Sequence, residues 1–269
     1  MAATSIFARF PATSFISQAE FAQFRRAAQE RLDARYSHEA ALAARDEAFV
    51  LPGTCAPCLR PARFGCDTRG WDRRPDGQKE PAWDDTLVCD CADALGKRAR
   101  AVVHFAQSLA ALRNWTRLLL FGPPDPSHRR LAALAGETLV RPSLLTSGAA
   151  FRLDAADESC HLAIAVECLH RVPPLDAALA EFRRILVPGG SLAFTVPFRH
   201  NAPRTLSRGD LARPDGRLPA MLREPAHEIG WDILDRLRDA GFADARLHCY
   251  WSAELGYLGP FSMIVHATL

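Results

Sequence analysis

From residue 115 onward the chain alternates short apolar runs with amphipathic segments, and this alternation constrains the fold more than any other feature. Apolar runs at 116–122, 161–167 and 191–197 predict buried strands, and residues 137–142 predict a weaker one. The segment between 161–167 and 191–197 repeats apolar side chains at helical spacing. Strands separated by helices predict a parallel sheet that is covered by helices.

The last forty residues change this pattern. A helix is predicted over 230–240, where Gly241 closes it, and two strands follow at 243–251 and 261–269. No helical segment separates these two strands, and so short a connection favours an antiparallel hairpin over a crossover. The sequence therefore predicts a parallel α/β sheet that ends in an antiparallel hairpin.

One segment resembles a known family in detail. VECLHRVPPLDAALAEFRRILVPGGSLAFTVPF (166–198) is similar to the passage between the fourth and fifth strands of class I S-adenosylmethionine (SAM) dependent methyltransferases. It has an apolar strand, a Leu–His step, an amphipathic helix and a Pro188–Gly189–Gly190 turn, which is expected to end the helix and reverse the chain. Residues 227–251 also resemble the end of that family. The resemblance covers residues 115–269 and implies a Rossmann-like fold.

The resemblance also implies a cofactor and a reaction. It implies that SAM lies at the carboxyl ends of the parallel strands, where open α/β sheets bind ligands. The residues that match the family's cofactor site follow the first and fourth strands of this part: Phe121, Gly122, Pro123, Glu167, Leu169 and His170. The expected function is methyl transfer to a small-molecule or saccharide acceptor.

The loop after the first strand supports a second interpretation. FGPPDPSH (121–128) contains one glycine, and its three prolines have no N–H to donate to a cofactor. The second strand ends near Arg141, where the family has an acid for the ribose. The alternative is therefore a catalytically degenerate, methyltransferase-like scaffold that binds a protein partner. A Rossmann dehydrogenase is disfavoured, because no G-x-G-x-x-G follows the first strand.

Two histidines are candidates for the general base that a hydroxyl or amine acceptor requires. His200 follows the strand at 191–197, and His227 precedes the last helix. A capping or packing role for His227 is the alternative. The segment 199–226 between them is rich in Pro and Arg, which suits a lid or an acceptor-binding loop, and its charge would suit an acidic acceptor.

Five of the eight cysteines lie between residues 55 and 91. Cys55 and Cys58 precede Cys89 and Cys91 by about thirty residues, and two such thiolate pairs can close around Zn²⁺. Cys66 is an alternative ligand. A similar arrangement, with WDDTLVCDCADALGKRARA (83–101) around the second pair, occurs in a subgroup of the methyltransferases. Free cysteines in a surface loop remain the alternative to a structural zinc ion.

The segment 51–91 is poor in aliphatic side chains, so we expect that it needs a metal rather than a core of its own. Ser17 and Glu20 form a capping-box pattern that predicts a helix over 17–47. The expected organisation is a helical extension (1–50), a cysteine-rich zinc module with a linking helix (51–114) and a methyltransferase-like domain (115–269).

Composition limits the partners. The net charge is +2 and the arginines are scattered among acids, which argues against a nucleic-acid partner. No apolar run approaches the roughly 18 residues that span a bilayer, so no membrane association and a cytoplasmic location are expected.

Overall fold

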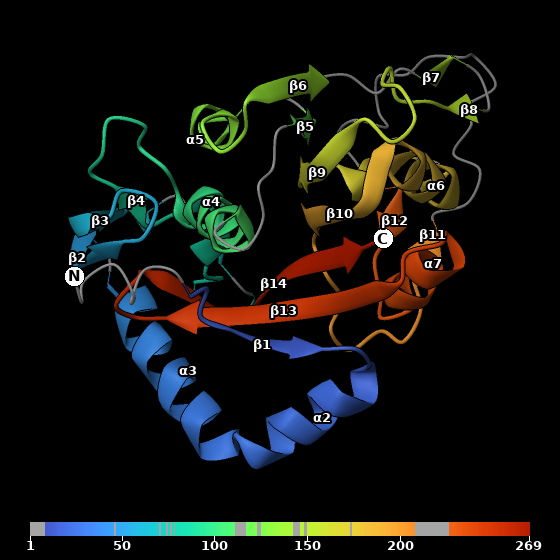
Figure 1. Cartoon of the computed structure of the whole chain (residues 1–269). Helices are drawn as coiled ribbons and strands as arrows, with labels where there is room; N and C mark the ends of the chain where they lie inside the picture. The colour runs from blue at the N-terminus through green and yellow to red at the C-terminus, as the bar shows by residue number, and fades with distance from the viewer. Residues whose placement is uncertain are drawn as a thin grey trace.

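The computed structural model describes residues 9–45, 47–69, 71–73, 75, 77, 79–110, 117–122, 125–141, 146–147, 150–172, 174–207 and 226–269. Its main feature is a seven-stranded mixed sheet (Figure 1). In spatial order the strands are β1 (Ala12–Phe15), β13 (Asp244–Ser252), β14 (Tyr257–Thr268), β10 (Leu186–Thr195), β9 (Cys160–Val166), β5 (Arg117–Phe121) and β6 (Glu137–Arg141).

The sheet has a parallel half and an antiparallel half. Strands β6, β5, β9 and β10 run parallel to one another, whereas β14 is antiparallel to β10 and to β13. Strand β14 therefore lies between β10 and β13 although it is last in the chain. The predicted Rossmann-like α/β fold with a C-terminal antiparallel hairpin is confirmed.

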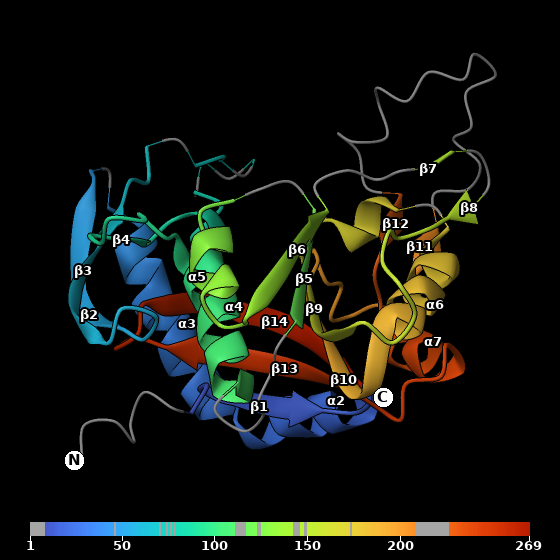
Figure 2. The same cartoon turned by 45° about the horizontal axis from the view of Figure 1, so that its top comes forward.

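Helices cover both faces of the parallel half (Figure 2). Helices α4 (Lys97–Ala110) and α5 (His128–Ala132) lie on one face, and α6 (Leu175–Ile185) and α7 (Ile233–Asp239) lie on the other. Strand β5 shows why both faces are needed. Leu118 and Leu120 join the core beneath α4, whereas Leu119 and Phe121 join the core beneath α6, as period-two alternation requires.

The Pro-Gly-Gly segment differs from the expectation. Helix α6 ends at Ile185 and β10 begins at Leu186, so these three residues lie inside the strand rather than before it. Leu186 pairs with Cys160 and Ser191 pairs with Leu162, which makes the intervening residues of β10 a bulge. Pro188 has no N–H for a regular ladder, and a bulge is where a strand tolerates such a residue.

The first fifty residues are not only helical. The helix predicted over 17–47 is two helices, α2 (Gln18–Ala27) and α3 (Gln29–Ala43), which form a V beside β1 and β13 (Figure 1). The predicted cap is present, because Glu20 N donates to Ser17 Oγ at 3.3 Å. Strand β1, which the sequence analysis missed, extends the sheet along β13.

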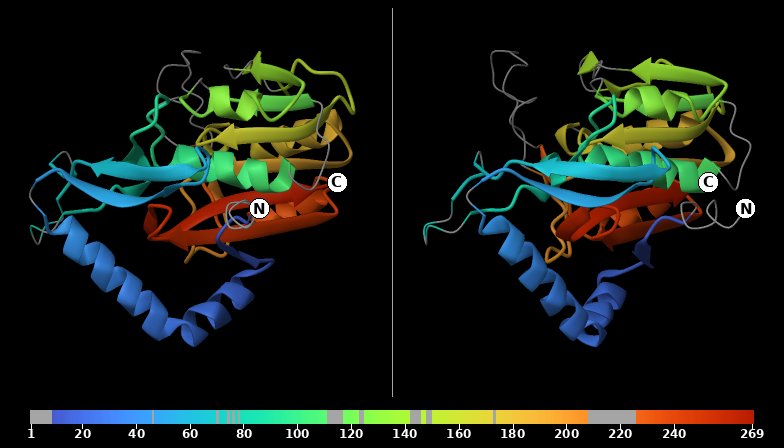
Figure 3. Two further views of the ribbon diagram at one scale, coloured as in Figure 1. Left: turned by 60° about the vertical axis from the view of Figure 1, so that its left-hand side comes forward. Right: turned by 90° about the vertical axis from the view of Figure 1, so that its left-hand side faces the viewer.

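The cysteine-rich segment forms a small sheet of its own, with β2 (Phe49–Cys55), β3 (Arg60–Cys66) and β4 (Val88–Cys89), and a 3₁₀ turn η1 (Trp83–Asp85). It packs against the β13–β14 turn, where Thr54 N donates to Glu254 O at 2.8 Å (Figure 3). A Cβ at Gly53 would lie 2.2 Å from Glu254 O, so only glycine permits this approach.

This module has a hydrophobic core, contrary to the sequence-based expectation. Phe64, Trp71, Trp83 and Leu87 are buried together with Leu258 of β14. The aliphatic count underestimated this core because aromatic side chains supply much of its area and the hairpin supplies the rest.

The remaining elements are short. They are η2 (Leu169–Arg171), β7 (Thr146–Ser147), β8 (Ala150–Phe151), β11 (Leu206–Ser207) and β12 (His227–Glu228). None of the described helices is both long and apolar enough to cross a lipid bilayer.

Candidate functional site

The carboxyl ends of β5 and β9 meet at Gly122 and Cys168. Gly122 has a φ of +113°, and a Cβ there would lie 3.1 Å from Cys168 Sγ. The Cys168 thiol donates to Phe121 O at 3.4 Å. The chain therefore leaves β5 through a turn that a side chain at position 122 would obstruct.

Glu167, the first residue after β9, also has left-handed backbone geometry, with a φ of +50°. Such a conformation is uncommon for a residue with a side chain and is frequent at functional sites. Its backbone N donates to Thr195 O at 3.0 Å. Burial raises the pKa of Glu167 and the neighbouring Arg98 opposes that rise.

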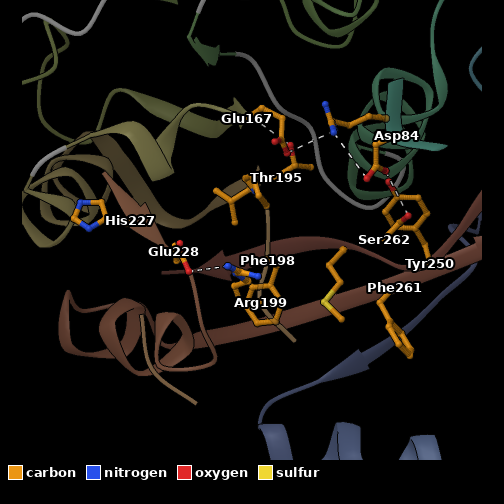
Figure 4. A pocket seen from close by; sticks show the side chains of 14 residues that line it. Asp84, Glu167, Thr195, Phe198, Arg199, His227, Glu228, Tyr250, Phe261 and Ser262 are labelled. Carbon is orange, nitrogen blue, oxygen red and sulfur yellow. Dashed lines mark hydrogen bonds and ion pairs between the residues drawn. The ribbon is translucent and has the colours of Figure 1, made fainter. Parts of the chain in front are cut away.

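A cavity of about 430 Å³ opens beside Glu167 (Figure 4). Its walls come from the ends of β9 and β10, from β13 and β14, from β12, and from α4 and η1. The lining residues are Asp84, Arg98, Glu167, Thr195, Val196, Pro197, Phe198, Arg199, His227, Glu228, Tyr250, Phe261, Ser262 and Met263.

Charged side chains at one end of the cavity form a network. Arg98 lies 3.6 Å from a Glu167 carboxylate oxygen, 3.8 Å from Asp84 and 3.0 Å from Asp85. Behind Asp84, the fully buried Lys97 donates to Asp84 Oδ1 at 2.5 Å and also to Ser262. Lys97 and Arg98 hold the pKa of Asp84 below its usual range although burial acts to raise it.

The sequence analysis did not predict Asp84, Lys97 or Arg98 for this cavity. All three lie in 83–101, the segment that carries the resemblance around the second cysteine pair. These charged residues precede the parallel strands in the sequence. They could have been predicted for this cavity only by knowing that η1 and α4 reach the ends of those strands.

The predicted cofactor residues lie in different surroundings. Gly122 and Glu167 lie at the strand ends, whereas Phe121 and Leu169 are buried in the core. His170 lies in η2, where burial lowers its pKa to about 4 and its Nδ1 has no hydrogen-bond partner among the described residues. Pro123 lies outside the described residues.

The structure separates the two predicted bases. His227 lines the cavity, with Nε2 2.9 Å from Val172 O and Nδ1 3.0 Å from Ser207 Oγ. His200 lines another cavity, of about 450 Å³, and its ring lies 4.7 Å from that of Phe261. Burial lowers the pKa of both imidazoles, so both are neutral at pH 7.

Three of the predicted metal ligands converge. Cys55 ends β2, Cys58 lies in the following turn and Cys89 lies in β4, and their Sγ atoms are within 4.8 Å of one another.

Cys91 lies beside this cluster. Burial acts to raise its pKa, but N–H groups of Leu95 and Asp93 and the thiols of Cys89 and Cys58 hold that pKa below its usual value. Cys66 instead hydrogen-bonds with Thr86 and the Leu87 backbone. The fold thus groups Cys55, Cys58 and Cys89, with Cys91 beside them, and thiolates in such pairs suit Zn²⁺.

Residues 124–194 match a family model described as a methyltransferase domain. This part of the chain is therefore similar to a methyltransferase domain. The matched segment runs from the turn after β5 through β9 and α6 into β10, which includes Glu167 and His170.

Solved methyltransferases are similar to this chain at low identity. The SAM-dependent enzyme of Thermotoga maritima is 18% identical over 61% of this chain and 86% of its own, with a TM-score of 0.36. That of Mesorhizobium loti is 16% identical over 58% and 91%, with a TM-score of 0.38. That of Archaeoglobus fulgidus is 13% identical over 64% and 94%, with a TM-score of 0.41. No curated protein matches the chain.

Proposed function

We propose that this chain binds SAM and methylates a small-molecule or saccharide acceptor held in the cavity beside Glu167. The observation that carries the proposal is the Arg98–Glu167 ion pair. It lies at the end of β9, and both of its side chains line the cavity. Open α/β sheets bind their ligands at these strand ends.

The groups at this edge fit the amino-acid part of SAM. That part carries an α-carboxylate and an α-ammonium, and Arg98 and Glu167 offer the complementary charges side by side. The turn at Gly122 and the unpartnered Nδ1 of His170 supply further contacts. We infer that Gly122, Glu167, His170 and Arg98 hold the cofactor, with Phe121 and Leu169 packing behind them and Pro123 in the loop. SAM supplies the sulfonium methyl group, and the chain positions the acceptor in line with it.

The cavity walls favour a neutral acceptor. Phe198, Phe261 and Met263 present apolar surface that suits the C–H face of a ring, and carboxylates at both ends can accept hydrogen bonds from hydroxyls. Among the described lining residues, Arg98 is assigned to the carboxylate of SAM and Arg199 is paired with Glu228 at 2.9 Å, which leaves neither arginine for an acidic acceptor. The pairing supports a sugar-like or other uncharged acceptor over an acidic one.

Of the two predicted bases, His227 is favoured by the geometry because it lines this cavity. Its neutral ring accepts a proton through Nδ1 when Ser207 Oγ gives up that contact. His200 belongs to the other cavity and is better placed to pack against Phe261.

We also infer that Cys55, Cys58, Cys89 and Cys91 bind one structural zinc ion. Four thiolate ligands complete a tetrahedral shell and leave no open position for catalysis. The metal supplies folding free energy to a module whose own core is small.

Isothermal titration calorimetry tests the cofactor assignment. We expect the wild-type chain to bind SAM and S-adenosylhomocysteine with micromolar Kd. Replacing Arg98 by Met should weaken both at least about tenfold, because the carboxylate loses a charge-assisted hydrogen bond. His200→Ala is the matched control and should bind like the wild type. Absence of heat at high micromolar ligand would contradict the proposal and favour the partner-binding scaffold.

A further inference from the structure

Helix α5 connects the cofactor side of the sheet to the cysteine cluster. It begins directly after the β5 turn, by which we mean Gly122 and residues 125–127. Ser127 N donates to Asp125 Oδ1 at 2.6 Å, and Asp125 N donates to His128 Nδ1 at 2.9 Å. Leu131, on the inner side of α5, is fully buried. Local hydrogen bonds therefore tie residues 125–127 of the β5 turn to the first residue of α5.

Arg130 extends from α5 to the cysteine-rich module. Its Nε donates to Asp93 Oδ2 at 2.6 Å, and its Nη2 lies 3.9 Å from Cys58 Sγ. The Asp93 carboxylate is only 7% exposed, and the Asp93 N–H bonds to Cys91 sulfur. The Arg130 guanidinium thus contacts the Cys58 thiol and also Asp93, whose N–H bonds to the Cys91 sulfur.

We propose that Arg130 is a positioning residue that couples metal occupancy of the cysteine cluster to cofactor binding at the β5 turn. This inference rests on the proposed function, because it needs both the zinc ion and SAM. It assigns to the cluster a role beyond folding the module.

The coupling has an electrostatic and a geometric source. Four thiolates around one divalent cation carry a net charge of about −2, so metal loading strengthens the attraction on Arg130. Loading also fixes Cys58 and the Cys91–Leu95 turn, to which Arg130 is anchored through Asp93. Since coupling free energies are reciprocal, a ligand at the β5 turn must in turn retain the metal more tightly.

The experiment compares two neighbouring arginines. Arg129 lies on the same helix and also contacts Asp93, at 3.0 Å, but it is 82% exposed and contacts no sulfur atom among the described residues. S-adenosylhomocysteine is titrated into zinc-loaded and chelator-treated protein of the wild type, Arg130→Met and Arg129→Met. Zinc release to a chromophoric chelator is timed with and without that ligand.

In the wild type and in Arg129→Met, we expect metal removal to weaken ligand binding about tenfold, and the ligand to slow zinc release. Loaded Arg130→Met should bind the ligand as weakly as the metal-free wild type, with zinc release insensitive to the ligand. If circular dichroism shows that the metal-free chain unfolds, the loaded Arg130→Met and Arg129→Met proteins decide the comparison alone.

Equal ligand affinities of those two loaded variants would overturn the coupling role while leaving SAM binding intact. A wild type that binds zinc but no S-adenosylhomocysteine would overturn the proposed function and this inference together. If the wild-type protein binds S-adenosylhomocysteine but does not bind zinc, this inference is overturned and the proposed SAM binding stands.

Discussion

Lys97 shows what a single residue can decide in this protein. Its ammonium is fully buried between Asp84, Ser262 and the face of the Tyr250 ring, 5.5 Å from the ring centroid. Burial lowers the pKa of Lys97, and Asp84 opposes this by favouring the charged form. A buried cation of this kind is tolerated only with its partner in place.

Loss of Asp84 should therefore destabilise the fold. We expect Asp84→Asn to lower the free energy of unfolding by about 3 kcal/mol, because Lys97 is left without its counter-charge. Asp85→Asn is the matched control: its side chain is 72% exposed and, among the described residues, forms an ion pair with Arg98, so we expect a change below about 0.5 kcal/mol. Urea unfolding measures both, and equal losses for the two variants would show that the ion pair does not stabilise the fold.

At the scale of elements, the cysteine-rich module depends on the hairpin as well as on its cysteines. Arg100 is buried, stacks on Phe64 at 3.9 Å and donates to Leu87 O at 3.0 Å and Gly256 O at 2.9 Å. The guanidinium thereby joins α4, the module and the β13–β14 turn. Removal of the proposed zinc ion should therefore loosen the module, while the large sheet retains its two other cores.

The zinc assignment makes a prediction at this scale. Purified protein should contain one zinc per chain, and Cys55→Ser should lose it, since tetrahedral binding needs every thiolate. Cys66→Ser should keep the metal, because its thiol bonds to Thr86 and Leu87. Metal analysis with thiol titration checks both. Zinc well below one equivalent in the wild type would contradict the assignment.

Local sequence patterns predicted most elements but not their ends. Apolar runs identified the buried strands β5, β9, β10, β13 and β14, because a two-sided core requires such runs. The break between α2 and α3 falls at Ala28, and no Gly or Pro there indicates it in the sequence. Strand β1 is only four residues long, and its pairing with β13 is decided across more than two hundred residues.

The whole molecule should lose stability as the pH falls. Burial lowers the pKa of His170 to about 4 and that of His248 to about 3, below the ordinary histidine value of about 6.5. Below pH 6.5 the unfolded chain binds protons that the folded chain excludes. Stability from these groups is therefore full above pH 6.5 and declines toward pH 3, by up to about 1.4 kcal/mol per pH unit for each histidine.

Urea unfolding at several pH values between 7 and 4.5 measures this dependence. The double variant His170→Gln, His248→Gln should show a flatter profile than the wild type, because it lacks both titrating groups. If the free energy of unfolding of that variant falls with pH as steeply as that of the wild type, other groups cause the acid sensitivity.

The sequence by itself determined the fold class, since strand and helix periods and the short final connection are local properties of the chain. It also predicted Gly122, Glu167 and the four cysteines as site residues, because they lie next to strand ends or in close pairs. Only the tertiary structure brought Asp84 and Arg98 to Glu167, placed His227 in that cavity and His200 outside it, and set Arg130 against Cys58. The Arg98–Glu167 and Arg130–Cys58 contacts join residues 69 and 72 positions apart. Their geometry depends on how α4 and α5 pack on the finished sheet, which no local pattern encodes.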